Sequence, residues 1–177
     1  ADGYGHGAVR VAVAALKSGA SFLAVASISE GIELREAGIV APILSLSLPL
    51  KEEIPSLIVH SITPLVFDFE FVDQLNDVAV SMHRRIPVHL KIDTGMGRVG
   101  CFPEEVEDLA KKINQTEGLY LEGVCTHLCC ADSTSEDDMS FTQNQIKKFK
   151  ECVDIIKKMG INPGIVHCSN SGAIFLH

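Results

Sequence analysis

Residues 86–100 read IPVHLKIDTGMGRVG, a strand-length segment that runs directly into a glycine-rich loop. Successive side chains of a β-strand point to opposite faces, so the apolar and polar positions of this segment separate. The polar positions are His89, Lys91 and Asp93. An unpaired charge inside a protein is costly, and we therefore expect partners for this face if it points inward. Arg98 follows the glycines and is placed to fold back over the strand end.

A strand followed by a helix is the pattern on both sides of this stretch. Apolar residues at helical spacing, in several cases followed by a glycine, predict helices over 8–18, 29–37, 52–59, 70–83, 103–114 and 139–159. Short apolar runs predict strands over 21–27, 42–47, 62–67, 86–93, 119–126 and 164–168. Strands that alternate with helices in this way run parallel and are joined by right-handed crossovers.

Two α/β architectures share this alternation, the doubly wound open sheet and the (β/α)8 barrel of TIM type. The glycine fingerprint of a dinucleotide-binding unit fails, because Gly3, Gly5 and Gly7 do not follow the G-x-G-x-x-G spacing. The predicted strands favour an incomplete (β/α)8 barrel whose first and last strands are missing or truncated. Residues 1–177 then form one partial barrel domain, with its chemistry at the C-terminal ends of the strands.

Composition argues against several classes of function. A net charge of −8 without a basic cluster argues against nucleic-acid binding. No apolar stretch approaches the ~20 residues that cross a bilayer, and the opening lacks the regions of a signal peptide. Without a starting Met, the chain is expected to have lost a segment upstream of Ala1. Six irregularly spaced cysteines indicate free thiols in a reducing, cytoplasmic compartment.

The densest cysteine group invites a zinc interpretation, and we predict no metal there. The group consists of Cys125, His127, Cys129 and Cys130. Cys129 and Cys130 are adjacent rather than two residues apart, and strand alternation turns neighbouring side chains of the group to opposite faces.

Unusual residues lie at four predicted strand ends. One is the 86–100 stretch, whose polar groups bind a ligand or form a purely structural ion-pair network. The opening ADGYGHG, residues 1–7, can approach a ligand closely or be a plain glycine-rich turn. His127 ends another strand, where a histidine is structural more often than functional. HCSNSGA, residues 167–173, enters a helix start that can bind an anion or serve only as an N-cap. Together these strand ends indicate a barrel enzyme for a phosphorylated aromatic ligand.

The same motifs resemble those of the alanine racemase family. ADGYGHG at 1–7, KIDTGMGRVG at 91–100, Thr126-His127 and HCSNSGA at 167–173 occur in the family's order and cover nearly the whole chain. KIDTGMGRVG is the most specific of the four. The resemblance implies an isomerase that interconverts L- and D-alanine through a Schiff base with pyridoxal 5′-phosphate (PLP), which acts as an electron sink.

The resemblance also implies roles for individual residues at the cofactor. Tyr4, Asn170 and Ser171 match residues at the PLP phosphate. His127 matches a histidine that packs beside the pyridine ring. Arg98 matches an arginine that donates to the phenolic oxygen of PLP and lies near the substrate carboxylate.

Lys91 matches a lysine that many members of the family carry as a carbamate, an anion that holds this arginine in place. Lys91 and Arg98 would repel each other as adjacent cations on an inward face, which favours conversion of the lysine. An unmodified Lys91 bonded to Asp93 is the alternative. Arg98, Lys91 and His127 are thus the expected catalytic residues.

By the same resemblance, other parts of the machinery lie outside these 177 residues. They are the Schiff-base lysine directly before Ala1, an arginine beyond the eighth strand, and a tyrosine from the C-terminal β-domain of a second subunit. We therefore expect a homodimeric cytoplasmic enzyme that makes D-alanine for peptidoglycan, and a fragment that is inactive alone. The alternatives are a family member acting on serine or a basic amino acid, a non-catalytic PLP-binding barrel, and a phosphate-binding barrel enzyme without PLP.

Overall fold

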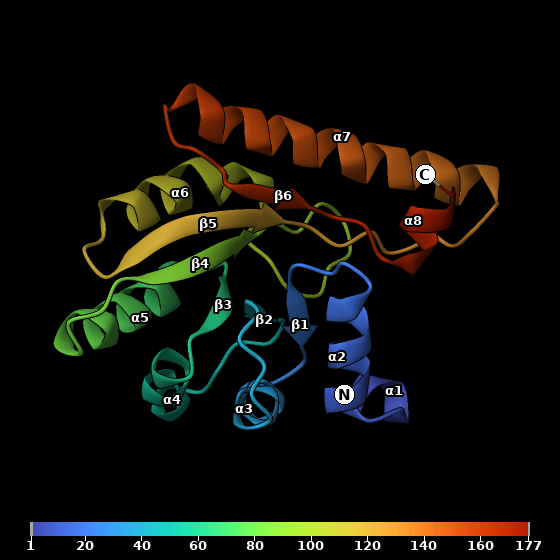
Figure 1. Cartoon of the computed structure of the whole chain (residues 1–177). Helices are drawn as coiled ribbons and strands as arrows, with labels where there is room; N and C mark the ends of the chain where they lie inside the picture. The colour runs from blue at the N-terminus through green and yellow to red at the C-terminus, as the bar shows by residue number, and fades with distance from the viewer. Residues whose placement is uncertain (1, 177) are drawn as a thin grey trace.

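The computed structural model describes residues 2–176, which contain six strands in one parallel sheet. The strands are β1 (Leu23–Val25), β2 (Ile43–Ser45), β3 (Ile62–Val66), β4 (Ile86–Lys91), β5 (Leu119–Cys125) and β6 (Ile165–His167). Their order in the sheet follows their order in the sequence. The sheet curls as part of a barrel, which confirms the predicted incomplete (β/α)8 fold (Figure 1).

Helices precede the first strand, connect the successive strands and follow the last one, and they lie around the outside of the curled sheet (Figure 1). They are α2 (Ala8–Lys17), α3 (Ile28–Glu36), α4 (Ile54–Val59), α5 (Phe69–Ser81), α6 (Val106–Gln115), α7 (Glu136–Lys158) and α8 (Ser171–Leu176). The short elements are α1 (Asp2–Gly5), η1 (Lys51–Glu53) and η2 (Pro103–Glu105). Predicted and observed elements agree closely, although β1 is shorter than predicted at both ends. Ala1, which opens the first motif, lies outside the described residues.

Local sequence explains where three of the helices begin. Ser27, Asp68 and Ser135 each accept a hydrogen bond from the backbone N–H three residues ahead, at the starts of α3, α5 and α7. Such N-caps contribute about 1 kcal/mol each. Within residues 2–176, none of these helices is long and apolar enough to span a membrane.

Strand β4 separates two environments. Val88, Leu90 and Ile92 are fully buried in the main apolar core, which lies between the sheet and the helices. His89 and Lys91 belong to the opposite face and have exposed fractions of only 1% and 7%. The alternation predicted from the sequence is therefore confirmed, and the polar face of the strand points into the barrel.

A β-bulge interrupts the pairing of β4 with β5. Val88 pairs with Leu121. The next residue of β4, His89, pairs with Gly123, so that Glu122 is skipped. Bulges re-aim side chains, and this one turns Glu122 into the barrel, where its Oε2 lies 3.3 Å from Nε2 of His89.

Gly123 leaves the space that the His89 ring occupies. A Cβ atom at Gly123 would lie 2.6 Å from Cε1 and 2.7 Å from Nδ1 of His89. Side chains do not approach so closely, so either the ring or the backbone would have to shift. The histidine on β4 therefore requires a glycine opposite it on β5.

We predict that Gly123→Ala destabilises the protein by about 1–3 kcal/mol, because the added methyl group overpacks against a ring held by hydrogen bonds. Gly31→Ala is the matched control. Its Cβ would meet Cδ1 of Ile62 at 2.7 Å, which is the flexible end of a side chain, and alanine favours the α3 helix. Chemical denaturation of both variants in the complete protein measures the difference. Equal unfolding free energies for the two variants would contradict this account of the packing.

Candidate active site

The C-terminal ends of β4, β5 and β6 border a cavity of about 350 Å³. Four residues predicted from the sequence line it: Lys91, Arg98, His127 and Asn170. His167, the last residue of β6, also lines it. The four predicted residues come from separate segments of the chain, and the barrel fold brings them together at the edge where barrel enzymes hold their active sites.

Lys91 ends β4 and is nearly buried at the cavity wall. Its Nζ donates a hydrogen bond to the backbone oxygen of Ile92 at 3.3 Å. Burial lowers the pKa of Lys91, and the charge of Arg98 lowers it too, while Cys125 and Asp93 act in the opposite direction. The net effect makes the neutral amine, which is the nucleophilic form of a lysine, more available.

Asp93 shapes the loop that carries Arg98. Its Oδ1 accepts a hydrogen bond from the backbone N–H of Gly95 at 2.8 Å, and its Oδ2 accepts one from the N–H of Arg98 at 3.1 Å. Burial alone would raise the pKa of Asp93, but the backbone donors of the loop hold it below its ordinary value. The carboxylate is thus engaged by its own loop, and a bond between Lys91 and Asp93 is not the arrangement found.

His127 follows β5 and is half-buried at the cavity wall. Burial lowers the pKa of His127, and the charges of Arg98 and Lys91 lower it further, so the ring is neutral at neutral pH. Gln145 of α7 donates to the backbone oxygen of His127 at 3.2 Å and to Oγ1 of Thr94 at 3.4 Å. Gln145 therefore ties the two loops of the site together, a role that no sequence motif indicated.

Asn170 caps α8 and lines the cavity at the same time. Its Oδ1 accepts a hydrogen bond from the N–H of Ala173 at 3.0 Å, and its Nδ2 donates to the backbone oxygen of Leu128 at 2.8 Å. Asn170 therefore caps the start of α8, and its role at an anion stays a prediction. Ser171, the first residue of α8, is exposed beside it.

Tyr4 lies away from this cavity. The backbone of the α1 turn is left-handed at Tyr4, with φ of 59°, and the side chain is 96% exposed. Tyr4 borders a different hollow of about 340 Å³, beside α2 and β1. The structure does not bring Tyr4 together with Arg98 and His127, so its role at a phosphate stays a prediction.

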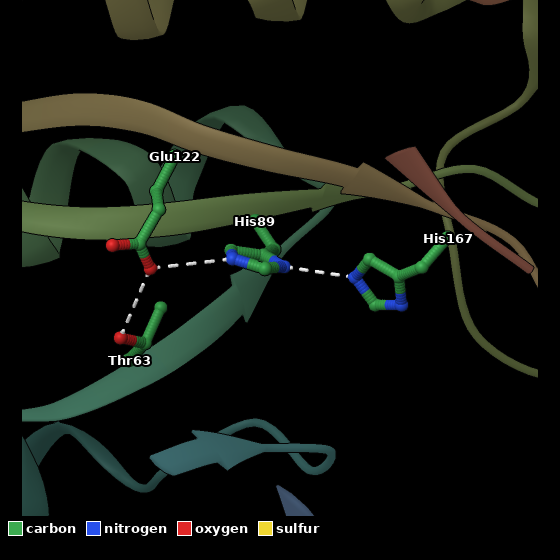
Figure 2. Close-up of polar contacts among 4 residues, drawn as sticks. All are labelled: Thr63, His89, Glu122 and His167. Carbon is green, nitrogen blue, oxygen red and sulfur yellow. Dashed lines mark hydrogen bonds and ion pairs between the residues drawn. The ribbon is translucent and has the colours of Figure 1, made fainter. Parts of the chain in front are cut away.

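Four polar side chains form a hydrogen-bonded row inside the barrel, which we call the interior row: Thr63, Glu122, His89 and His167 (Figure 2). Thr63 Oγ1 donates to Glu122 Oε2 at 3.5 Å, and the same oxygen lies 3.3 Å from Nε2 of His89. Nδ1 of His89 lies 2.9 Å from Nε2 of His167. The sequence pointed to His89 as a polar inward residue, whereas the position of Glu122 depends on the bulge.

The cysteines are all free, and those of the predicted group occupy different surroundings. Cys125 packs inside the barrel with Leu44 and Leu65, and burial raises the pKa of its thiol to about 12. Cys129 and Cys130 lie on the loop after β5, with their Sγ atoms 3.7 Å apart. Among residues 2–176, no three His, Cys, Asp or Glu side chains are placed to share a metal ion.

Known proteins resemble this chain along its whole length. The family model "Alanine racemase, N-terminal domain" matches residues 1–177. The alanine racemase of Treponema denticola is 58% identical over 174 residues, which are 98% of this chain and 46% of that protein. The alanine racemase of Treponema pallidum is 44% identical over 180 residues, covering 100% of this chain and 48% of that protein. The chain therefore spans about half the length of these curated relatives.

A solved structure gives the same result for the fold. The alanine racemase of Clostridium difficile 630 matches with a TM-score of 0.92 and 39% sequence identity. The match covers 98% of this chain and 47% of that chain. The arrangement of strands and helices described above is thus that of the corresponding part of a solved alanine racemase.

The buried, neutral His89 makes a testable contribution to stability. Burial, with a smaller effect of His167, lowers the pKa of His89 from its ordinary 6.5 to about 4. Between pH 6.5 and about pH 4, the unfolded chain binds a proton at this histidine and the folded chain does not. The contribution of His89 to the unfolding free energy is therefore fully present above its pKa in the unfolded chain. It is lost as the pH falls through its pKa in the folded chain.

We predict that the unfolding free energy falls by up to about 3 kcal/mol through His89 between about pH 7 and pH 4. His89→Gln removes this part of the pH dependence. His83→Asn is the control, because His83 is exposed and its left-handed backbone suits asparagine. Denaturation of the complete protein across this range measures the effect. If His89→Gln and His83→Asn show the same pH dependence, His89 does not carry it.

Proposed function

This chain belongs to the alanine racemase N-terminal domain family, and on that premise we propose that the complete protein interconverts L- and D-alanine with PLP as its cofactor. The observation that carries the proposal is the cavity in which Lys91, Arg98, His127 and Asn170 meet. Relatives named alanine racemase favour alanine over serine or a basic amino acid as substrate. We place the enzyme in the cytoplasm as a homodimer, with residues 1–177 as a partial barrel domain followed by a C-terminal β-domain.

The cavity suits PLP in size and in charge. Small-molecule pockets are commonly about 300–1,000 Å³, and this one holds about 350 Å³. PLP carries a phosphate and an anionic phenolic oxygen, for which the guanidinium of Arg98 is a well-matched donor. The neutral ring of His127 offers a flat surface without adding a further positive charge.

In this assignment Arg98 would donate to the phenolic oxygen of PLP, and His127 would lie beside the pyridine ring. Asn170 and Ser171 lie toward the phosphate. A phosphate contact from Tyr4 requires the opening segment to adopt a position different from the one described above. When bound, PLP supplies an electron sink that allows the α-carbon of an amino acid to lose its proton.

The residues of this chain orient groups and hold charge. The N–H contact of Arg98 with Asp93 fixes the backbone of the arginine, whose guanidinium would lie beside the phenolic oxygen and near the substrate carboxylate. Racemisation needs proton transfer on both faces of the α-carbon. By family resemblance we assign these two steps to a lysine directly before Ala1 and to a tyrosine of the partner subunit.

We also propose that Lys91 is carbamylated. Its neutral amine adds to CO2, a nitrogen–carbon bond forms, and one proton leaves, so that a potential cation becomes an anion. Burial favours this reaction because it lowers the pKa of Lys91 and so makes the neutral amine available. The resulting carbamate and the guanidinium of Arg98 attract each other, and charge-assisted hydrogen bonds between such groups are strong.

The carbamate predicts an added mass of one CO2 on the complete protein. Intact mass spectrometry of a sample protected from acid detects it. Lys91→Arg lacks the added mass, while Lys112→Arg, a change at a surface ion pair with Asp73, retains it. An unmodified wild-type mass under these conditions contradicts the carbamate and leaves the assignment of the cavity intact.

We expect the complete protein, loaded with PLP, to convert L-alanine to D-alanine in preference to L-serine. Arg98→Lys is predicted to lower kcat/KM by about 10- to 100-fold, because a lysine keeps the charge and loses the paired donors. The control is Arg10→Lys on the exposed side of α2. Chiral product analysis measures both variants. Absence of alanine racemisation in the wild type contradicts the function, and equal activity of the two variants contradicts the role of Arg98.

A further inference from the structure

The interior row ends at the cavity that we assign to the cofactor. His167 lines this cavity and also a second cavity of about 310 Å³, which His89 and Phe22 line as well. Glu122, at the other end of the contact with His89, has a side chain that is 26% exposed. The row therefore joins a carboxylate inside the barrel to an imidazole at the cavity wall (Figure 2).

The order of donors and acceptors along the row follows from the carboxylate. An ionised carboxylate only accepts hydrogen bonds, so Nε2 of His89, which faces Glu122, carries a proton. A neutral imidazole carries a single proton, and this leaves Nδ1 of His89 as an acceptor. Nε2 of His167, at 2.9 Å, must then be the donor. A neutral His167 in this tautomer has an unprotonated Nδ1.

The surroundings keep both histidines neutral. Burial, with the effect of His167, lowers the pKa of His89 to about 4. Burial also lowers the pKa of His167, and the charge of Lys91 lowers it further. A protonated His167 would place a second cation in the cavity that holds Arg98, which like-charge repulsion disfavours.

The protonation of Glu122, the carboxylate in the interior row, decides which atoms donate and which accept. Burial raises the pKa of Glu122, whereas the hydrogen bond from Thr63 opposes that change. Part of the Glu122 side chain remains exposed, so water solvates the carboxylate and limits the cost of burying its charge. Glu122 is therefore the group that sets the direction of the hydrogen bonds.

We propose that Glu122 is a positioning residue for the cofactor cavity: acting through His89, it fixes His167 as the Nε2–H tautomer and presents an unprotonated Nδ1 at the cavity wall. Among residues 2–176, the His167 ring makes its hydrogen bond through Nε2, to His89, and none is found at Nδ1. Because His167 lines the cofactor cavity, we assign this nitrogen as an acceptor for an N–H or O–H donor bound there. The effect of this tautomer on the cofactor rests on the proposed function. The tautomer itself does not require PLP.

The backbone supports this role independently of the side-chain contacts. A one-residue bulge brings Glu122 to the inner face of β5, beside His89. Gly123, the residue paired with His89, has no side chain where the ring lies. Two departures from regular strand structure thus occur together, and both serve the contact between one histidine and one carboxylate.

The test is the tautomer of His167, read by NMR of the ring nitrogens in complete protein labelled with 15N-histidine and free of PLP. A His167→Gln variant identifies the His167 signals. In the wild type we expect Nε2 protonated and Nδ1 unprotonated. Glu122→Leu removes the acceptor and gives signals of both tautomers. Glu122→Gln restores the wild-type pattern, because its carbonyl oxygen accepts from His89.

Thr63→Val is the matched control, since it removes a hydroxyl group from the same row without touching His89, and it retains the wild-type tautomer. A proton on Nδ1 of His167 in the wild type overturns the proposal. So does a Glu122→Leu variant with the wild-type pattern, or a Glu122→Gln variant that behaves like Glu122→Leu. If Glu122→Leu does not fold, a proton on Nδ1 of His167 in the wild-type or the Glu122→Gln spectrum still overturns the proposal.

A separate titration with PLP, followed by its absorbance, distinguishes this proposal from the proposed function. A wild-type protein with the expected tautomer that fails to bind PLP contradicts the cofactor assignment and leaves the role of Glu122 in place. A wild-type protein that binds PLP but carries the proton on Nδ1 of His167 contradicts the role of Glu122 and leaves the cofactor assignment in place.

Discussion

The alternation of side chains along β4 is the constraint on which the rest of the site depends. Its apolar face packs into the core beneath the helices, and this places His89 and Lys91 inside the barrel. A buried polar group without a partner costs about 1–3 kcal/mol, so the neighbouring strands must supply partners. Strand β5 does so with a bulge that turns Glu122 inward and a glycine, Gly123, that leaves room for the ring.

The cavity beside this strand controls charge mainly through burial. Burial lowers the pKa of Lys91, His127 and His167, so the low-dielectric wall favours their neutral forms. Arg98 supplies a lasting positive charge, because a guanidinium keeps its proton in proteins. The cavity thus combines the guanidinium of Arg98 with two imidazoles that favour their neutral forms, which suits an anionic aromatic ligand.

Most of the fold could be predicted from the sequence, because strand–helix alternation is a local pattern and parallel strands align their carboxyl ends. The same rule brought Lys91 and Arg98 into one predicted site. Glu122 was missed because a one-residue bulge reverses strand alternation without a local sequence signal. Gln145 was missed because its contacts join loops that are distant in sequence. Tyr4 was assigned by resemblance alone, and in the structure it borders a different hollow from the one that Arg98 and His127 line.

In the proposed function, the cavity at the ends of β4, β5 and β6 holds the cofactor. A crystal structure of the complete protein grown with PLP tests it most directly. We expect electron density for the cofactor within this cavity, with Arg98 at the phenolic oxygen, His127 beside the ring and Asn170 toward the phosphate. Density for PLP elsewhere in the protein, with this cavity filled only by water, would contradict it.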